Sequence, residues 1–246
     1  MLVNVSYDFL PKIPSANAAV VMDHFGVGFE AGRKTIADHL ELPIQPGDVV
    51  LFSGPSGSGK SSLMRAAASQ LDGVLNADAL NLGDDILVDA LPTPTAESLS
   101  LLAACGLGEA QLLLRIPQEL SDGQRYRFRL ALALAQKPQW IVADEFTAAL
   151  DRPLAKVIAF NLRKLASRIG VGCLFATTHE DIREDLQPDV IVRCGLDGTV
   201  QATRPDVKKN ESASPIGCGS RRVPQPTGRT LLAGTTAAIT SGSCAS

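Results

Sequence analysis

The sequence predicts an α/β fold built around a phosphate-binding loop, and three observations support this prediction. Residues 54–61 match the pattern G-x-x-x-x-G-K-S, and a short apolar run at 49–52 precedes them. The segment 61–68 that follows favours a helix, so the order is strand, glycine loop, helix. A second apolar run, 140–143, ends in two acidic residues, as expected for a buried strand that delivers carboxylates to the edge of a sheet.

The glycine loop has the chemistry of a triphosphate cradle. Its glycines let the backbone curl so that consecutive N–H groups point at phosphate oxygens. Lys60 supplies a positive charge for the β- and γ-phosphates, and the Ser61 hydroxyl is a ligand for Mg²⁺. The residues predicted to bind the phosphates are Gly54, Ser56, Gly57, Ser58, Gly59, Lys60, Ser61 and Ser62.

The remaining elements follow from apolar periodicity and from turn residues. Residues 1–48 predict short strands and turns. Further strands are expected at 18–22, 49–52, 85–89, 140–143 and 171–177, with a late hairpin of 189–193 and 199–201. Helices are expected at 61–71, at 95–114 with a break at Gly106, at 122–136, and at 153–169.

Composition sets the limits on the class of protein. The chain has 246 residues, 45% of them hydrophobic and 20% charged, and a net charge of −3, which gives no case for a basic nucleic-acid surface. Five cysteines without a C-x-x-C pair suggest neither a zinc site nor a disulfide framework. With no signal peptide and no apolar stretch of ~18–20 residues, we expect a cytoplasmic protein without a membrane span.

The composition also changes along the chain and predicts two regions. Residues 1–204 carry all the elements named above. Residues 205–246 are rich in Gly, Ser, Thr, Pro and Ala with little apolar periodicity, so they cannot bury enough surface to offset their ordering entropy. We therefore expect one folded domain, 1–204, and a low-complexity, disordered tail, 205–246.

The two acidic residues after the strand at 140–143 have distinct expected roles. Asp144 is placed to hold the Mg²⁺ shell, and Glu145 is placed to accept a proton from an attacking water. A third block, Leu120-Ser121-Asp122-Gly123-Gln124, precedes the helix at 122–136, where Ser121 is suited to cap the helix.

These blocks, followed by Ala149-Leu150-Asp151 and Thr178-His179, resemble an ABC-type ATPase domain over roughly residues 20–202. The resemblance implies that Ser121, Gly123 and Gln124 bind the ATP held by a second subunit, and that Asp151 links the two sites. It also implies that His179 contacts the γ-phosphate and the attacking water. An aromatic upstream of the loop would stack on adenine, and Phe25 and Phe29 are equal candidates.

The chain departs from the family pattern at two places. Asp122 replaces the first glycine of the signature pair, and Asp89 stands where the family's Q-loop glutamine is expected. About thirty residues separate Asp89 from Leu120, so the helical subdomain is shortened relative to transporter ATPases. The glutamine and the longer helical arm are what transporters use to grip their membrane domains, so their loss argues against transport.

A narrower resemblance is to the soluble ABC-type ATPases that are often fused to a predicted acetyltransferase domain, carried by segments 86–92, 120–130 and 176–181. The leading hypothesis is an ATP-hydrolysing homodimer with Mg²⁺ that is not coupled to transport. The alternatives are a transporter's ATP-binding subunit and a nucleic-acid-associated ATPase. For the last, Arg125, Arg127 and Arg129 are candidates, although a solvated helix face is the favoured interpretation of these arginines.

Overall fold

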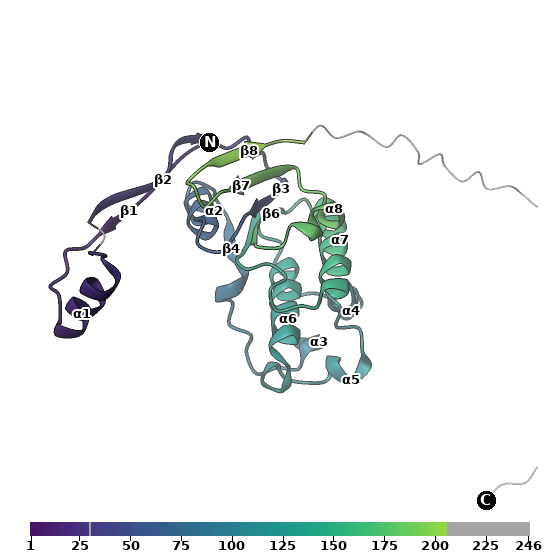
Figure 1. Ribbon diagram of the computed structural model, residues 1–246. Helices are drawn as coiled ribbons and strands as arrows, with labels where there is room; N and C mark the ends of the chain where they lie inside the picture. Colours follow the sequence, from purple (N-terminus) through teal and green to yellow (C-terminus); the bar gives the residue numbers. More distant parts are fainter. Residues whose placement is uncertain (30, 206–246) are drawn as a thin grey trace, which may run out of the picture. The chain divides into compact units, whose positions relative to one another are not determined.

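A computed structural model describes residues 1–29 and 31–205 (Figure 1). Within this part of the chain the strands form a six-stranded sheet of order β4-β5-β6-β3-β7-β8 and a two-stranded sheet of β1 and β2. The strands are β1 Leu2–Phe9, β2 Gly32–Glu41, β3 Val49–Ser53, β4 Val74–Asn76, β5 Trp140–Ala143, β6 Gly172–Thr177, β7 Val190–Cys194 and β8 Val200–Thr203.

The larger sheet is mixed. Strand β3 lies between β6 and β7 and pairs with both in parallel, while β4, β5 and β6 continue the parallel part on one side. The edge strand β8 pairs antiparallel with β7, which confirms the predicted late hairpin. Because parallel strands end at one edge, the segments after β3, β5 and β6 meet there.

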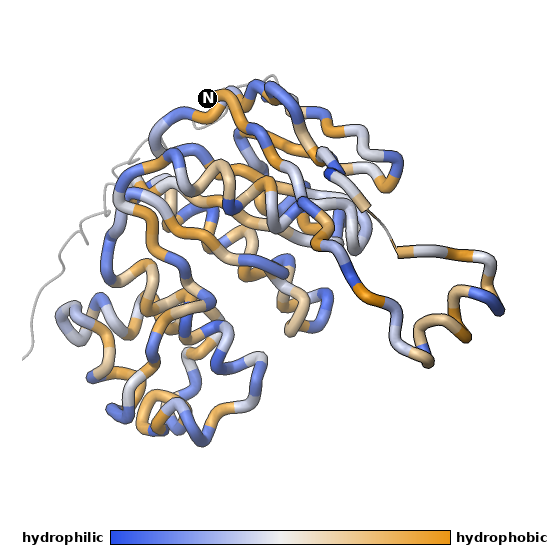
Figure 2. Tube along the Cα trace, turned by 90° about the vertical axis from the view of Figure 1, so that its left-hand side faces the viewer, coloured by the Kyte–Doolittle hydropathy of each residue, from blue (hydrophilic) through white to orange (hydrophobic). Residues whose placement is uncertain are grey.

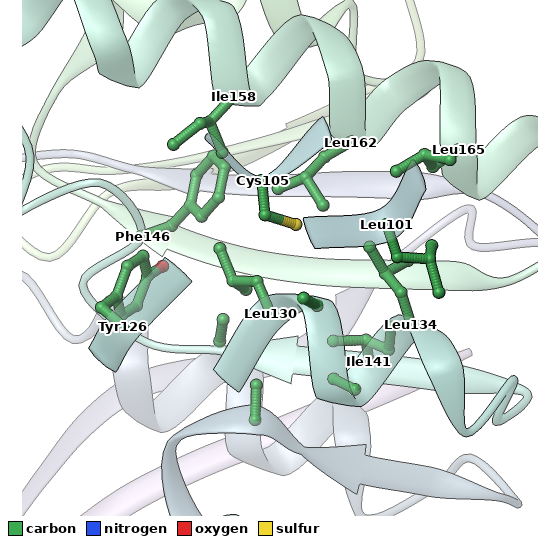
Figure 3. Packing of buried hydrophobic residues seen from close by; sticks show 14 of the residues in the cluster. Leu101, Cys105, Tyr126, Leu130, Leu134, Ile141, Phe146, Ile158, Leu162 and Leu165 are labelled. Atoms are coloured by element: carbon green, nitrogen blue, oxygen red, sulfur yellow. The ribbon is translucent and has the colours of Figure 1, made fainter. Parts of the chain in front are cut away.

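The helices of the described residues are α1 Ala16–Phe25, α2 Lys60–Ala68, α3 Leu87–Ala90, α4 Thr95–Ala104, α5 Ala110–Leu113, α6 Asp122–Ala135, α7 Arg152–Ile169 and α8 Arg183–Leu186. Of these, α2 packs on one face of the larger sheet, and α6 and α7 pack on the other. One core cluster joins a sheet face to α4, α6 and α7, and the other joins the opposite face to α2 and the N-terminal strands. The first is shown in Figure 3, where side chains of α6 and α7 face one another, with Leu101 of α4 at one end of the cluster and Phe146 at the other.

Most predicted helices are confirmed. Helix α6 starts at Ser121, whose hydroxyl accepts a hydrogen bond from the Gln124 N–H at 3.3 Å, as the capping prediction requires. Helix α7 carries Pro153 in its first turn, and the predicted break near Gly106 separates α4 from α5.

Two predicted strands are wrong. The segment 18–22 lies in helix α1, because Ser15 caps the N-terminus through the Ala18 N–H and Gly26 closes the C-terminus in the left-handed region. Figure 2 colours much of this segment as hydrophobic, yet α1 buries none of its residues.

The segment 85–89 is also not a strand. Leu87–Ala90 forms the short helix α3. Leu87 and Leu91 are both buried, whereas Asp89, which an alternating strand would place on the same face, is exposed, so the burial follows helical spacing. The Leu87 N–H donates to the Arg115 carbonyl across the helical subdomain, so no strand partner holds this segment. Between the phosphate loop and α6, the segment that pairs with the larger sheet is therefore β4 and not residues 85–89.

No helix among residues 1–29 and 31–205 is long and apolar enough to cross a membrane. Of the tail predicted at 205–246, all but Pro205 lies outside the described residues.

Candidate nucleotide-binding site

The phosphate loop joins β3 to α2 and depends on its glycines. Gly54 has φ +143°, and a Cβ there would collide with the Cys194 carbonyl, so the backbone of this loop lies directly against β7. Gly57 and Gly59 have φ of +80° and +91°, conformations that other residues adopt only with strain. The loop therefore folds as the sequence predicts, with the first turn of α2 beginning at Lys60.

Lys60 is the buried cation of the loop. Its residue is 8% exposed, and its Nζ donates to the Pro55 carbonyl at 2.7 Å. No carboxylate of the described residues forms an ion pair with it. Burial lowers the pKa of Lys60, and the charges of Asp144 and Glu145 oppose this shift. A desolvated ammonium in a cradle of backbone N–H groups is suited to an anionic ligand.

Ser61 and Asp144 come together across the sheet edge. The Ser61 hydroxyl donates to Asp144 Oδ1 at 2.8 Å, and Arg65 donates to Oδ2 at 3.1 Å. A hydroxyl beside a carboxylate is a pair of hard oxygen donors of the kind that Mg²⁺ takes while keeping several of its waters. The residues present therefore fit the magnesium ion that the sequence predicts.

Glu145 follows Asp144 in a tight turn at the end of β5. Its φ is +49°, and Thr147 has φ +71°, so two non-glycine residues of this turn lie in the left-handed region. Between them Phe146 is fully buried and stacks on Phe175 with ring centroids 4.3 Å apart. The Phe146 N–H also donates to the Ala176 carbonyl at 2.7 Å. We call residues 144–150 the carboxylate turn.

A cavity of about 880 Å³ lies over the phosphate loop and the carboxylate turn. The predicted site residues that line it are Ser56, Gly57, Ser58, Gly59, Lys60, Ser61, Ser62, Asp144 and Glu145. The segment that follows β6 joins them through Thr177 and Thr178. The structure therefore brings the predicted phosphate, metal and base positions into one space.

The aromatic residues at this cavity are not the expected ones. Tyr7 and Phe9, at the end of β1, line it, whereas Phe25 and Phe29 do not. The Tyr7 hydroxyl contacts the Ser62 hydroxyl at the start of α2. The sequence signal that marks them is an alternating strand at 2–9 that ends in aromatic residues upstream of the loop.

The signature residues lie elsewhere on the same chain. Ser121, Gly123, Gln124 and Asp151 do not line the cavity over their own phosphate loop. Ser121 and Gln124 form a capping box, and Asp151 caps α7 by accepting from the Leu154 N–H at 2.9 Å. These side chains are local helix caps within this chain.

Four charged residues of α6 differ in their surroundings. The side chain of Asp122 is 93% exposed and pairs with Arg125 at 2.7 Å. Arg127 donates to the Gly123 and Gly106 carbonyls, and its pKa is lowered by burial. The Arg129 Nε is buried without a hydrogen-bond partner in the described part of the chain, and all three arginines are half-buried, so the α6 face that carries them is only partly solvated.

His179 lies beside the cavity and does not line it. Its backbone N–H donates to the Thr177 hydroxyl at 3.0 Å, which fixes the chain as it leaves β6. Burial lowers the pKa of the imidazole, and the charge of Arg152 lowers it further, so the neutral form is favoured near neutral pH.

Sequence reasoning missed one polar residue of this edge. Asp78 follows β4, and its Oδ2 accepts the backbone N–H of Asp144 at 2.7 Å. Burial raises the pKa of Asp78 above its usual value, and the hydrogen bond from the Asp144 N–H offsets only part of this shift. Asp89, where the Q-loop position was expected, is an exposed residue of α3.

Known proteins resemble this chain in sequence. The lipoprotein-releasing system ATP-binding protein LolD of Novosphingobium aromaticivorans is 31% identical over 194 residues, which are 63% of this chain and 85% of that protein. The sulfate/thiosulfate import ATP-binding protein CysA of a Synechocystis species is 30% identical over 203 residues, but the chain spans only 56% of its length. No protein-family model matches the chain.

The fold has solved neighbours as well. A dimeric, post-hydrolysis structure of the ATP-binding cassette MJ0796 with ADP and Pi superposes with a TM-score of 0.58 at 20% identity, over 82% of this chain and 97% of that one. The chain belongs to the ABC-type ATPases, a family that binds and hydrolyses ATP. The predicted fold class, a phosphate-loop core of ABC type with a shortened helical subdomain, is confirmed.

Proposed function

We propose that this chain hydrolyses MgATP in the cavity over its phosphate loop. The observation that carries the proposal is the buried Lys60 ammonium, held in a glycine cradle by a backbone carbonyl and close to the Ser61–Asp144 pair. ATP replaces the Pro55 carbonyl as the partner of Lys60, and the loop N–H groups and the start of α2 bind the phosphate oxygens. Tyr7 and Phe9 line this cavity and are the aromatic side chains available to stack on adenine.

The residues at the reacting end of the cavity have separate roles in this proposal. Ser61 and Asp144 hold Mg²⁺, which neutralises charge on the β- and γ-phosphates when bound. Glu145 accepts the proton of the attacking water, because it lines the cavity beside Asp144. His179 follows Thr177 and Thr178, which line the cavity, and the family resemblance assigns the contact with the γ-phosphate to its side chain, which is favoured in the neutral form.

The active form is a homodimer with two sandwiched nucleotides. Ser121, Gly123, Gln124 and Asp151 do not line the cavity of their own chain, so their predicted contacts with ATP need a second copy. Asp122 is compatible with this arrangement, because the Arg125 guanidinium paired with it offsets the charge of its carboxylate. Like-charge repulsion of the triphosphate is reduced accordingly.

Two variants test this function with purified protein. Lys60→Ala removes the main cation of the cradle and abolishes ATP binding measured by titration calorimetry. Glu145→Gln retains binding, loses roughly 10²–10⁴-fold in turnover, and sediments as a dimer with MgATP and as a monomer without it. Undiminished turnover of Glu145→Gln rules out Glu145 as the base, and a monomer under both conditions rules out the sandwich.

The process coupled to hydrolysis has two candidates. The shortened segment between the phosphate loop and α6 supports a role outside transport. The names of the relatives, a lipoprotein-releasing and a sulfate import protein, favour the other candidate, the ATP-binding subunit of a transporter. Affinity purification of the Glu145→Gln chain from detergent-solubilised cells separates them, because stoichiometric capture of an integral membrane protein refutes the first.

The resemblance to acetyltransferase-fused ATPases supports an acetyltransferase as the partner in the first case. The same purification tests this, since the captured protein then binds acetyl coenzyme A.

We further propose a cytoplasmic location and a folded domain that ends near residue 204. Nucleic-acid binding is the least supported alternative, because Arg127 and Arg129 of α6 are half-buried and Arg127 is hydrogen-bonded to backbone carbonyls.

A further inference from the structure

The carboxylate turn begins at a hydrogen bond that the sequence did not reveal. The Asp144 N–H is the first backbone donor after β5, and it donates to Asp78 Oδ2 at 2.7 Å. Asp78 itself lies in a single 3-10 turn, Ala77–Ala79, that follows β4, and Asn76 caps this turn through the Asp78 N–H. Since β4 pairs in parallel with β5, the two strand ends are held side by side.

This hydrogen bond fixes a strained segment. Glu145 and Thr147 both have positive φ, and each such residue costs of order 1–3 kcal/mol unless its surroundings determine the conformation. Phe146 anchors the middle of the turn in the core, and the Ala148 N–H donates to the Glu145 carbonyl at 2.8 Å. Asp78 supplies the anchor at the start of the turn, immediately before Glu145.

The same corner contains a second cavity, of about 640 Å³, which shares Asp144 and Glu145 with the nucleotide cavity. Asp78 and Tyr126 line it, and the Tyr126 hydroxyl is buried without a hydrogen-bond partner in the described part of the chain. Figure 3 shows this hydroxyl next to Phe146. The wall behind the carboxylate turn therefore combines polar and apolar groups and leaves open space, so it does not hold the turn by packing alone.

From this geometry we infer that Asp78 is a positioning residue for hydrolysis, which orients Glu145 by fixing the Asp144 N–H. The inference rests on the proposed function of Glu145 and deepens it. Asp78 does not line the nucleotide cavity, so its removal leaves the phosphate cradle and the Lys60 environment intact. Its effect is therefore expected on the chemical step and not on ATP affinity.

The experiment compares Asp78→Ala with Asp78→Asn and with the matched control Asp89→Ala in the full chain. Asp78→Ala lowers kcat about 10- to 100-fold, the usual effect of losing a residue that orients a ligand, while KM and the calorimetric Kd for ATP stay within about threefold. Asp78→Asn keeps an acceptor oxygen and retains kcat within about threefold. Asp89→Ala, on the exposed side of α3, matches the wild type.

Several results overturn the inference. Turnover of Asp78→Ala within twofold of wild type does so, and so does an equal loss of kcat in Asp78→Ala and Asp78→Asn. If Asp78→Ala does not fold, Asp78→Glu takes its place, because the open cavity admits one more methylene while the carboxylate is displaced from the Asp144 N–H. A similar fall of kcat at unchanged Kd is then expected, and unchanged turnover refutes the role. A wild-type chain that binds no ATP refutes the proposed function instead.

Discussion

Phe146 lies between the proposed base and the second strained residue of the carboxylate turn, and its replacement tests whether the core holds the site. Its side chain is fully buried and stacks on Phe175 with an interplanar angle of 13°. Truncation of a buried Phe to Ala costs about 3–5 kcal/mol, of which an aromatic pair accounts for about 0.5–1.5 kcal/mol. For a domain of this size each kcal/mol lowers the melting temperature by about 2–4 °C.

Phe146→Ala is therefore expected to lower the melting temperature by roughly 6–20 °C in calorimetry. It is also expected to lower kcat more than 10-fold at a temperature where the variant is folded, because the turn loses its central anchor. Phe160→Ala is the matched control, since Phe160 is 43% exposed on α7, and its melting temperature stays within about 2 °C of wild type. A Phe146→Ala chain that melts within 2 °C of the wild type refutes the reasoning.

Two further predictions concern stability. Asp189 accepts hydrogen bonds from the Val49 N–H at 2.8 Å and from Arg163. Burial raises the pKa of Asp189, but these hydrogen bonds and the charge of Arg163 outweigh it and bring the pKa below its usual value. A depressed folded pKa gives stability that is present above the unfolded pKa of ~3.9 and is lost as pH falls through the folded pKa. Asp189→Asn is therefore expected to cost about 1–3 kcal/mol in urea titrations at pH 7, and the difference from wild type should shrink toward pH 2; a constant difference argues against the linkage. Truncation after Pro205 should leave melting temperature and turnover unchanged, whereas truncation before Arg204 should lower the melting temperature, because Arg204 donates to the Pro43 carbonyl at 2.9 Å and pairs with Asp48. Equal effects of the two truncations would contradict the boundary.

The parts of the fold that the sequence predicts are those with strong local signals. The runs at 49–52 and 140–143 are apolar throughout because parallel strands are buried on both faces, and both are confirmed as β3 and β5. The phosphate loop was predictable because its glycines must adopt positive φ in a fixed spacing. Both features can therefore be recognised from a short stretch of the sequence.

Apart from α1, whose caps Ser15 and Gly26 are local, the parts that were missed depend on distant contacts. The four residues of α3 are too few to show a period, and their helical state follows from a bond to Arg115 far along the chain. Strand β4 has only three residues, so nothing in the sequence places Asp78 beside Asp144. For the same reason the Q-loop position was expected at Asp89. The acid that accepts the hydrogen bond from Asp144 is instead Asp78, which follows the three-residue strand β4.

The signature and the carboxylate turn are in contact within one chain, which bears on how a second subunit affects hydrolysis. A Cβ at Gly123 would lie 3.0 Å from the Ala149 carbonyl, so the start of α6 packs directly on the end of the turn that contains Glu145. Any displacement of α6 by a nucleotide bound in trans is therefore transmitted to Ala149 by backbone contact. Asp78 and Phe146 hold the other end of the same turn. Glu145 thus lies between the contact of α6 with Ala149 and two points that the chain's own core keeps fixed, so we expect a displacement of α6 on dimer closure to change the position of the base.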